Sequence, residues 1–431
     1  MSQPPAAEVT ACLRKRWLLL LPAVFVTYSL AYLDRANYGF GAAAGLAATL
    51  HITGSQTALL GSLFFLGYFL FQVPGIAYAR RRNVSRLIFY ALLAWGTLAA
   101  LTGVIRSFWL LAIDRLLLGV AESLIFPAML LLLTHWFTRR ERSRANAILI
   151  LGNPGTILWM SAITGFLIHS FGWQMTFVIE GVPSIAWAFV WLLVVRDRPE
   201  KASWMSTEAS AHLSRELAAE QTALLQVPSL RKALLRTDVL LLSAQYFCWS
   251  LALYGFVLWL PTMIRQGSSL GIGITGLLSA IPYLLAVLSM LLVAYLSDKT
   301  LRRQSLVWPF LLLSGVALLG SFLFAAHSFW LAYACLILGG GAMFAPYGPF
   351  FAIIPELVPS NVCGETMALV NSFGALGAFF GSWIVGLLQA RTGDSRAGYL
   401  LIAISLMLSG FIMIIGFRQP TPRNATQLQP N

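Results

Sequence analysis

Residues 17–40 read WLLLLPAVFVTYSLAYLDRANYGF, a run in which Asp34 and Arg35 are the only charged residues. A helix crosses the hydrocarbon core of a membrane, about 30 Å thick, with roughly 20 apolar residues, so this run predicts a membrane-spanning helix. Of all 431 residues, 58% are hydrophobic and 10% are charged, and the mean hydropathy is +0.76. Soluble domains carry about 25% charged residues. The composition therefore excludes soluble, disordered and disulfide-scaffold proteins.

Runs of similar length and hydropathy recur along the chain and predict twelve spans. The first six lie at 17–40, 56–79, 86–105, 108–136, 142–169 and 173–195, and the last six at 238–264, 273–296, 304–326, 328–356, 362–390 and 397–417. The polar stretch 197–237 is predicted to be a cytoplasmic linker. We therefore expect an all-α membrane protein built from two pseudo-symmetric six-helix bundles, residues 1–196 and 238–431, which the linker joins.

The basic residues indicate the orientation in the membrane. Of the 29 Lys and Arg residues, 23 lie in the segments on the N-terminal side of the predicted spans, and four (Arg106, Arg265, Arg391 and Arg396) lie in the opposite loops. Loops rich in Lys and Arg stay in the cytoplasm, so both termini are predicted to be cytoplasmic. This distribution also explains the net charge of +13, and it leaves no basic face or tail for nucleic acid.

The two halves of the sequence echo each other at an offset of 218 to 220 residues. The corresponding positions are Gly119 with Gly339, Phe126-Pro127 with Ala345-Pro346, and Asn153 with Asn371. Two parallel six-helix halves, related by an axis along the membrane normal, form one of the known transporter architectures. In such transporters the substrate site lies between the halves, near the middle of the membrane.

The sequence lacks the signatures of metal, redox and nucleotide chemistry. Its four cysteines lie far apart without a C-x-x-C pair, at Cys12, Cys248, Cys335 and Cys363, and its five histidines are scattered. There is no Walker A motif for ATP. We therefore expect no bound metal, no cofactor and no enzymatic activity.

Asp34 and Arg35 interrupt the first predicted span, and Arg115 and Glu122 interrupt the fourth. Each costs at least about 2.5–3.5 kcal/mol to insert, so such residues usually mark a substrate or ion pathway. Helical spacing places Asp34 and Arg115 at similar depth in the outer half, with Glu122 about 10 Å deeper. This arrangement suits an anion that meets Arg and a proton that meets Glu. The alternative is two static ion pairs, Asp34–Arg115 and Arg35–Glu122, although buried pairs are poor stabilisers.

Polar and aromatic residues at similar depth are predicted to complete a substrate site. They are Tyr32, Tyr68, Gln72, Asn153, Gln245, Tyr254, Asn371 and Ser372. Amides and phenols both donate and accept hydrogen bonds, which suits a ligand rich in hydroxyl groups. The alternative for each is a hydrogen bond between helices. Asp114, near the outer end of its span, is predicted to be structural, and Glu180 stays open between the two interpretations.

Several motifs together resemble the major facilitator superfamily, and within it the anion:cation symporter branch, over essentially the whole chain. They are Tyr32-Leu33-Asp34-Arg35-Ala36-Asn37, Arg115 with Glu122, Phe126-Pro127, Trp136-Phe137, Glu141-Arg142-Ser143-Arg144-Ala145 and Trp259-Leu260-Pro261. Residues 28–45 and 150–154 look most like bacterial 2-ketogluconate and related hexonate transporters. The superfamily loop after span two normally carries an acidic residue, which residues 75–82 lack and which Asp298 retains in the second half.

The resemblance implies proton-coupled import of an organic anion, with Asp34 and Glu122 as proton carriers and Arg35 and Arg115 as carboxylate contacts. We expect a secondary transporter of the bacterial inner membrane that imports a sugar acid, such as 2-ketogluconate or a related hexonate, by alternating access. Its expected partners are the anion, protons and the lipid bilayer, without nucleic acid or an obligate protein partner. Import of another carboxylate, a dicarboxylate or an aromatic acid, is the alternative. A sensor or a membrane enzyme would need an output domain or catalytic cluster that the sequence lacks.

Overall fold

A computed structural model describes residues 6–80, 83–222, 230–267, 272–392 and 396–416, and the regular elements in these ranges are all helices. The first half contains α1 (Ala6–Ala43), α2 (Leu46–Thr49), α3 (Gly54–Arg80), α4 (Val84–Val104), α5 (Phe108–Ser123), α6 (Ile125–Thr134), α7 (Arg142–Ile150) and α8 (Gly152–Val194). Next come η1 (Pro199–Lys201), α9 (Thr207–Thr222) and α10 (Leu230–Leu234). The second half contains α11 (Thr237–Gly267), α12 (Ile272–Thr300), η2 (Gln304–Leu306), α13 (Trp308–Phe324), α14 (Phe329–Phe344), α15 (Tyr347–Leu357), α16 (Ser360–Thr392) and α17 (Arg396–Gly416).

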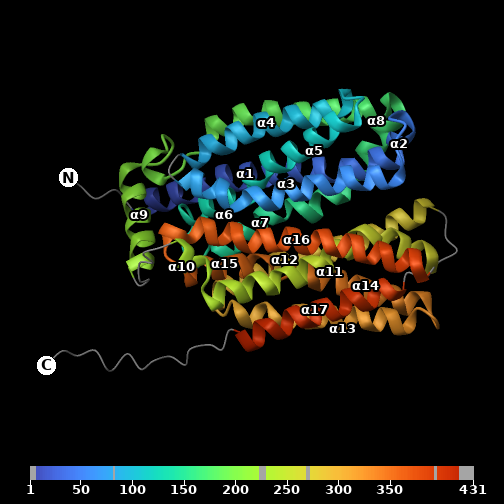
Figure 1. Ribbon diagram of the computed structural model, residues 1–431. Helices are drawn as coiled ribbons and strands as arrows, with labels where there is room; N and C mark the ends of the chain where they lie inside the picture. Colours follow the sequence, from blue (N-terminus) through green and yellow to red (C-terminus); the bar gives the residue numbers. More distant parts are fainter. Residues whose placement is uncertain (1–5, 81–82, 223–229, 268–271, 393–395, 417–431) are drawn as a thin grey trace.

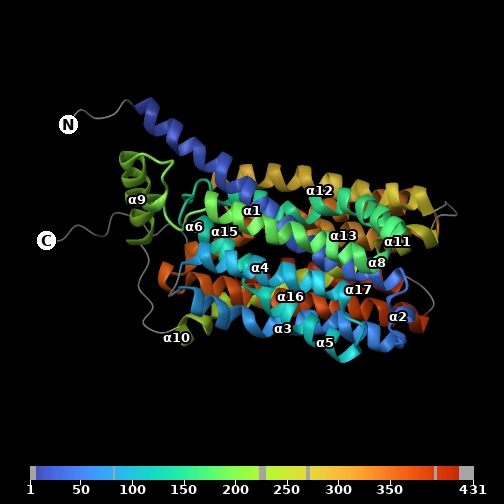
Figure 2. The ribbon, with the colours of Figure 1, turned by 90° about the horizontal axis from the view of Figure 1, so that it is seen from above.

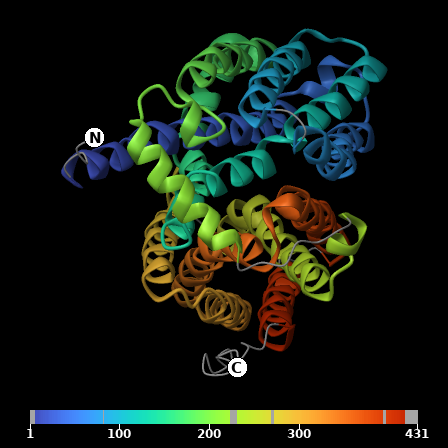
Figure 3. The same cartoon turned by 90° about the vertical axis from the view of Figure 1, so that its left-hand side faces the viewer.

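The long helices run roughly parallel and form two bundles, α1 to α8 and α11 to α17 (Figure 1). The bundles meet where α3 packs on α16 and α7 packs on α15. Helix α9 lies across one end of the bundles (Figures 1 and 3), which we call the α9 end. Seen from above, the beginning of α1 extends past the other long helices at this end (Figure 2).

Large apolar side chains cover the outside of the molecule. Leu193, Trp109 and Ile415 are 76%, 75% and 74% exposed. Water-soluble proteins rarely expose large contiguous apolar patches, whereas lipid covers such a surface without cost. The chain is therefore a multi-pass membrane protein.

Eleven helices in the described residues are long and apolar enough to cross a membrane, against the twelve predicted. The difference lies in α8, which contains the sixth predicted span and most of the fifth. Gly172 interrupts this helix with a backbone φ of 77°. The apolar stretch Ile163–Val194 extends over both sides of Gly172 and counts as one span. A separate crossing by the part before Gly172, and the cytoplasmic position of the termini, stay predictions.

Both halves break the equivalent span in the middle. In the first half α5 ends at Ser123 and α6 begins at Ile125, with Pro127 in its first turn. In the second half α14 ends at Phe344, and Pro346 immediately precedes α15. Proline lacks a backbone N–H, so it fits the first turn of a helix and kinks or breaks a helix in its interior. The repeat noted in the sequence thus marks an equivalent break in each bundle.

Candidate functional site

A small cavity lies between the two bundles. Its volume is about 20 Å³, enough for roughly one water molecule. Residues from both halves line it: Tyr28, Arg35, Phe64, Phe65, Tyr68 and Asn153 from the first, and Tyr246, Ser250, Tyr254, Tyr347, Asn371, Gly374, Ala375 and Ala378 from the second. Five of the residues predicted for the site are among them: Arg35, Tyr68, Asn153, Tyr254 and Asn371.

Arg35 is the charged residue among those that line the cavity, and it forms an ion pair with Glu122. The Arg35 Nε donates a hydrogen bond of 2.8 Å to Glu122 Oε2, and the guanidinium carbon lies 4.5 Å from the centroid of the Tyr68 ring. Glu122 is fully buried. Its Oε1 and the Arg35 Nη2 have no hydrogen-bond partner. Because buried polar atoms nearly always have partners, these two atoms are candidate contacts, the Glu122 Oε1 for a proton and the Arg35 Nη2 for an anion.

The close approach of α5 to α3 places Glu122 near the cavity arginine. A side-chain carbon at Gly119, one turn before Glu122, would lie 2.0 Å from the backbone oxygen of Phe64. At Gly67 on α3 it would lie 2.3 Å from the backbone oxygen of Leu116. Only glycine permits backbones to come this close. The two glycines therefore set the depth and direction of the Glu122 carboxylate.

Arg115 lies off the cavity wall and packs on aromatic rings. Its guanidinium carbon lies 4.6 Å from the ring centroid of Tyr38 and 5.4 Å from that of Phe64. The Arg35 guanidinium carbon lies 5.7 Å from the same Phe64 ring. A desolvated cation–π contact contributes about 2 kcal/mol or more, so the rings help to hold both cations. The Nε of Arg115 has no hydrogen-bond partner.

Asp34 faces α4 rather than the cavity. Its carboxylate accepts a hydrogen bond from Trp95 Nε1, and no ion pair of the described residues includes it. Asp34 still interacts electrostatically with Glu122 and Arg115. Of the two ion pairs considered from the sequence, the structure therefore forms Arg35–Glu122 and does not form Asp34–Arg115.

Two hydrogen bonds connect α3 to α16, and thus one bundle to the other. Asn371 Nδ2 donates to the Tyr68 hydroxyl at 3.4 Å, and the Ser372 hydroxyl donates to Gln72 Oε1 at 2.8 Å. The Gln72 Nε2 has no partner. These four predicted residues lie together although the bonded pairs are 303 and 300 positions apart in the sequence.

The remaining predicted residues divide into two groups. Asn153 lines the cavity with an unpartnered Oδ1, and Tyr254 lines it close enough to interact electrostatically with Arg35. Tyr32 is buried but does not line the cavity. Gln245 does not reach the cavity, because its Nε2 donates to Ser409 Oγ at 2.9 Å and joins α11 to α17.

Sequence reasoning missed several residues of the cavity wall, Tyr28, Phe64, Tyr246 and Tyr347 among them. Aromatic residues in apolar spans suit the interior of any helical bundle, so their type gave no signal. Trp95 was missed for the same reason. Its buried indole N–H requires an acceptor, which Asp34 provides.

Two further buried acids bind neutral partners. Asp114 accepts a hydrogen bond of 2.7 Å from the Thr102 hydroxyl, which joins α5 to α4 as expected of a structural residue. Glu180 on α8 contacts Asn37 Nδ2 and lies 2.8 Å from Thr164 Oγ1. Neither acid belongs to an ion pair within the described ranges.

At the α9 end, Asp298 on α12 holds the first turn of α7, which belongs to the other bundle. Its carboxylate accepts 3.0 Å hydrogen bonds from the backbone N–H groups of Ser143 and Arg144. It also forms ion pairs with Arg144 at 3.0 Å and with Arg303 at 2.8 Å. A carboxylate at a helix N-terminus satisfies unpaired N–H groups and complements the helix dipole. Asp298, the acid that the second half retains, therefore ties the bundles together at this end.

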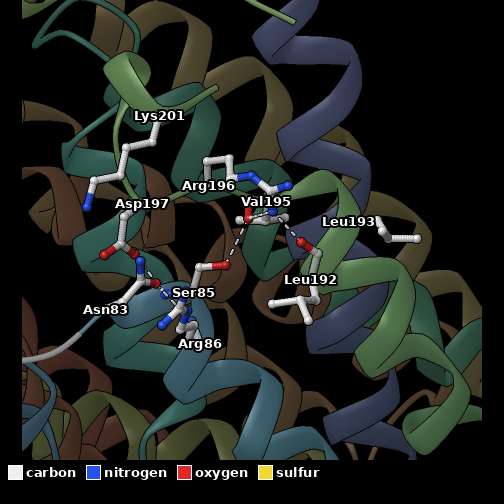
Figure 4. Close-up of a pocket in the computed structure, with 9 residues that line it drawn as sticks. All are labelled: Asn83, Ser85, Arg86, Leu192, Leu193, Val195, Arg196, Asp197 and Lys201. Atoms are coloured by element: carbon white, nitrogen blue, oxygen red, sulfur yellow. Dashed lines mark hydrogen bonds between the residues drawn. The ribbon is translucent and has the colours of Figure 1, made fainter. Parts of the chain in front are cut away.

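The first half also contains a pocket of its own at the α9 end, between the beginning of α4 and the end of α8 (Figure 4). Its volume is about 570 Å³. Asp197 accepts hydrogen bonds there from the backbone N–H groups of Val84 and Ser85, at 3.1 and 2.7 Å. The backbone oxygen of Asp197 lies 3.2 Å from His135 Nδ1, and burial lowers the pKa of His135. Residues of the first bundle and of the segment that follows it line this pocket, and no described residue of the second bundle does, so relative motion of the bundles would not open it to either side in turn.

A site built by both bundles can face each side of the membrane in turn when the bundles move relative to each other, and this is the architecture of a secondary transporter. A family model described as Major Facilitator Superfamily matches residues 24–382. The chain belongs to this superfamily and is a membrane transporter rather than an enzyme.

Similar proteins share this architecture along nearly their whole length. A putative tartrate transporter of Agrobacterium vitis is 31% identical, over 98% of each chain. A quinolone resistance transporter of Acinetobacter baumannii is 31% identical, over 95% of each chain. A probable galactarate/D-glucarate transporter of Bacillus subtilis is 24% identical, over 96% of this chain and 94% of the other. A solved proton:xylose symporter, bound to 6-bromo-6-deoxy-D-glucose, has the same fold with a TM-score of 0.74 at 13% identity, over 92% of this chain and 95% of the other.

Proposed function

We propose that this transporter imports an organic anion by proton symport, with alternating access across the bacterial inner membrane. The proposed substrate is a sugar acid such as 2-ketogluconate or a related hexonate. The observation that carries the proposal is the Arg35–Glu122 ion pair at a cavity that both bundles build. The Arg35 guanidinium can bind a substrate carboxylate once protonated Glu122 has released it. Anion binding is in this way coupled to proton binding.

In the proposed cycle, a proton neutralises Glu122 and frees the Arg35 guanidinium. The substrate carboxylate then takes the place of the Glu122 carboxylate, because a charge-assisted hydrogen bond to Arg is about twice as strong as a neutral one. Asp34, within electrostatic range of Glu122, is the proposed second proton carrier. Loss of the protons on the cytoplasmic side restores the ion pair and releases the substrate.

The amides and phenols of the cavity wall are the proposed contacts for substrate hydroxyl groups. Asn153, Tyr254 and Asn371 line the cavity, and the Asn153 Oδ1 lacks a partner. Arg115, Tyr32 and Gln245 stand off the wall in this conformation, and their predicted roles require a rearrangement when the substrate binds.

The cavity of the described conformation is smaller than the proposed substrate. A sugar acid is several times larger than the single water that the cavity holds. Asp298 and its partners tie the α9 end shut, so we propose that substrate enters from the opposite end when the bundles part there. In this proposal the α9 end faces the cytoplasm, as the distribution of Lys and Arg also predicts.

A second candidate is import of a dicarboxylate on the same scaffold. It is supported by the relatives whose names mention tartrate and galactarate/D-glucarate. A second carboxylate needs a second cation, and Arg115, on the Phe64 ring that also contacts Arg35, is the proposed one.

The test uses the purified full chain in proteoliposomes whose interior is more alkaline than the exterior. Labelled 2-ketogluconate, gluconate, tartrate and galactarate are offered in parallel. We expect accumulation of at least one carboxylate, abolished in Arg35→Gln and retained in the exposed control Arg106→Gln. The proposal fails if the pH gradient drives no carboxylate uptake, or if Arg35→Gln accumulates as wild type does. Proton-driven release of a quinolone without carboxylate uptake would assign the chain to drug export instead.

A further inference from the structure

The pocket between the beginning of α4 and the end of α8 has an excess of positive charge. Three basic side chains line it, Arg86, Arg196 and Lys201, and Asp197 is the one acid among its described lining residues (Figure 4). Arg86 and Lys201 are exposed, and Arg196 is partly buried. None of the three basic residues forms an ion pair with an acid in the described ranges.

The Asp197 carboxylate is engaged with the backbone of α4. Its two oxygens accept hydrogen bonds from the N–H groups of Val84 and Ser85, where a carboxylate satisfies unpaired donors and complements the helix dipole. This acid therefore stabilises the first turn of α4 and forms no ion pair with the cations of the pocket. The three cations remain free to bind an anion.

Arg196 is held in place at the end of α8. Its Nη1 contacts the backbone oxygen of Leu192 and lies 3.5 Å from that of Val195. A guanidinium has five N–H donors in a fixed planar arrangement, so the contacts of Nη1 leave other donors for the oxygens of a ligand. Phosphate is an anion whose geometry such a guanidinium matches well.

The opposite side of the pocket is apolar and faces the outside of the molecule. Leu193 lines the pocket and points away from Lys201 (Figure 4). Leu193 is 76% exposed, and Phe189, one turn earlier on α8, is 55% exposed. The Phe189 ring packs on Phe89 of α4 with a centroid distance of 5.7 Å. An apolar surface that spans both helices therefore extends from the pocket along the outside of the bundle.

The pocket lies where a membrane helix leaves the hydrocarbon core. Helix α8 ends at Val194, and Lys201 belongs to η1, the first element of the segment that leads to α9. Tyr90, one turn after Arg86 on α4, is 64% exposed. Tyr and Trp are enriched at the level of the lipid headgroups. The charged side of the pocket is therefore expected at headgroup level, with its apolar side beside the acyl chains.

We propose that this pocket binds the headgroup of an anionic phospholipid. Its phosphate contacts Arg86, Arg196 and Lys201, and an acyl chain follows Leu193 and Phe189. The volume of about 570 Å³ lies within the range of about 300–1,000 Å³ in which proteins hold small ligands. Basic pockets between membrane helices on the cytoplasmic side bind such headgroups. A free phosphate would meet the same cations but would leave the apolar side unused, which favours the lipid.

The bound lipid would join three elements of the structure. It would contact α4 through Arg86, the end of α8 through Arg196, and η1 through Lys201. An anionic lipid would thus hold the beginning of the linker on the first bundle. This role does not depend on the identity of the substrate or on proton coupling.

The test compares lipid binding to the purified full chain by native mass spectrometry, with phosphatidylglycerol and phosphatidylcholine as probes. Arg86→Gln/Lys201→Gln removes two exposed cations and leaves Arg196 with its contacts to α8. Each basic residue at a membrane surface strengthens binding of anionic lipid about fivefold, so the double variant should bind the first phosphatidylglycerol about 25-fold more weakly than wild type. Unchanged affinity would overturn the proposal.

Lys299→Gln/Arg302→Gln is the matched control, because it removes two exposed cations at the same end of the second bundle. This control should bind phosphatidylglycerol as wild type does. Equal weakening in both double variants would attribute the effect to surface charge in general and overturn the assignment to the pocket. Binding of phosphatidylcholine as tight as that of phosphatidylglycerol would also overturn the proposal.

Two further measurements separate the remaining outcomes. Glycerol 3-phosphate or inorganic phosphate should not displace the lipid at millimolar concentration, and displacement would assign the pocket to a soluble phosphate compound instead. Hydrogen exchange of wild type keeps the proposal testable even if Arg86→Gln/Lys201→Gln does not fold. The backbone amides of residues 195–201 should exchange more slowly in nanodiscs of phosphatidylglycerol than in those of phosphatidylcholine, and equal exchange in both would overturn the proposal.

Discussion

Replacing Glu122 by Gln should separate substrate binding from proton binding. The Arg35 Nε now donates a 2.8 Å hydrogen bond to a charged carboxylate, and in Glu122→Gln it would donate to a neutral amide oxygen. Hydrogen bonds to charged groups contribute about 1.5–3 kcal/mol and neutral ones about 0.5–1.5 kcal/mol. In Glu122→Gln, the hydrogen bond to Arg35 that the substrate must replace is therefore weaker by about 1–1.5 kcal/mol.

This difference predicts the binding curve. Because 1.4 kcal/mol corresponds to a factor of ten, Glu122→Gln should bind substrate about 5- to 12-fold more tightly than wild type at alkaline pH, where the wild-type Glu122 is ionised. At acidic pH the two should agree. The substrate affinity of wild type thus rises as pH falls. The substrate affinity of Glu122→Gln has no pH dependence that arises from position 122.

The assay is equilibrium binding of the transported carboxylate to detergent-purified protein over a range of pH, followed by uptake in proteoliposomes. We expect Glu122→Gln to exchange substrate in counterflow but to lose accumulation driven by a pH gradient. The Asp114→Asn control should keep the wild-type pH dependence. Unchanged pH dependence of binding in Glu122→Gln would refute the exchange of one carboxylate for another at Arg35.

Three more predictions concern the frame around the site. Asp298→Asn removes a charge-assisted contact worth about 1.5–3 kcal/mol, so the α9 end should open more often. In a background without the other cysteines, the buried Cys363 should then react with a thiol reagent at least about tenfold faster. An unchanged rate would show that the Asp298 carboxylate does not hold this end closed. Gly119→Val should lower the yield of folded protein and displace the Glu122 carboxylate, because a side-chain carbon at position 119 would lie 2.0 Å from the Phe64 backbone oxygen. Yield and uptake equal to those of wild type would contradict the close packing of α5 on α3. Burial lowers the pKa of His135, so the free energy of unfolding should keep its full value above the unfolded pKa of about 6.5 and fall as pH drops below that value. Thermal unfolding in detergent should show a smaller loss of stability at acidic pH for His135→Gln than for wild type. An equal loss in both proteins would contradict this role of His135.

The sequence allowed the spans to be predicted because each is a long apolar run, and charges in such runs are conspicuous. The ion pair of Arg35 with Glu122 was among the alternatives considered because both lie inside spans. The bond of Asp34 to Trp95 was not predictable, since it depends on how α1 is rotated against α4. Gln245 shows the converse: its residue type suits a substrate contact, but its place on α11 turns it toward Ser409.

The number of crossings shows a second limit. An apolar run predicts a span, but it does not show how sharply the chain turns between two runs, and in α8 Gly172 alone interrupts the helix between the fifth and sixth predicted spans. Hydropathy alone does not resolve two spans joined in this way. The hydrogen bonds of Glu180 with Asn37 and Thr164 were also beyond sequence analysis, because these residues come from three separate helical segments.

The small volume of the cavity beside the Arg35–Glu122 ion pair affects whether protons can cross the membrane without a substrate. An unloaded carrier in the proposed cycle returns with the two opposite charges neutralising each other in a space that holds a single water. If Glu122 took up a proton without cargo, the guanidinium would stay unpaired in that space, which is energetically costly. Protons should therefore cross the membrane together with a bound anion. Carriers without substrate would then not dissipate the proton gradient of the cell.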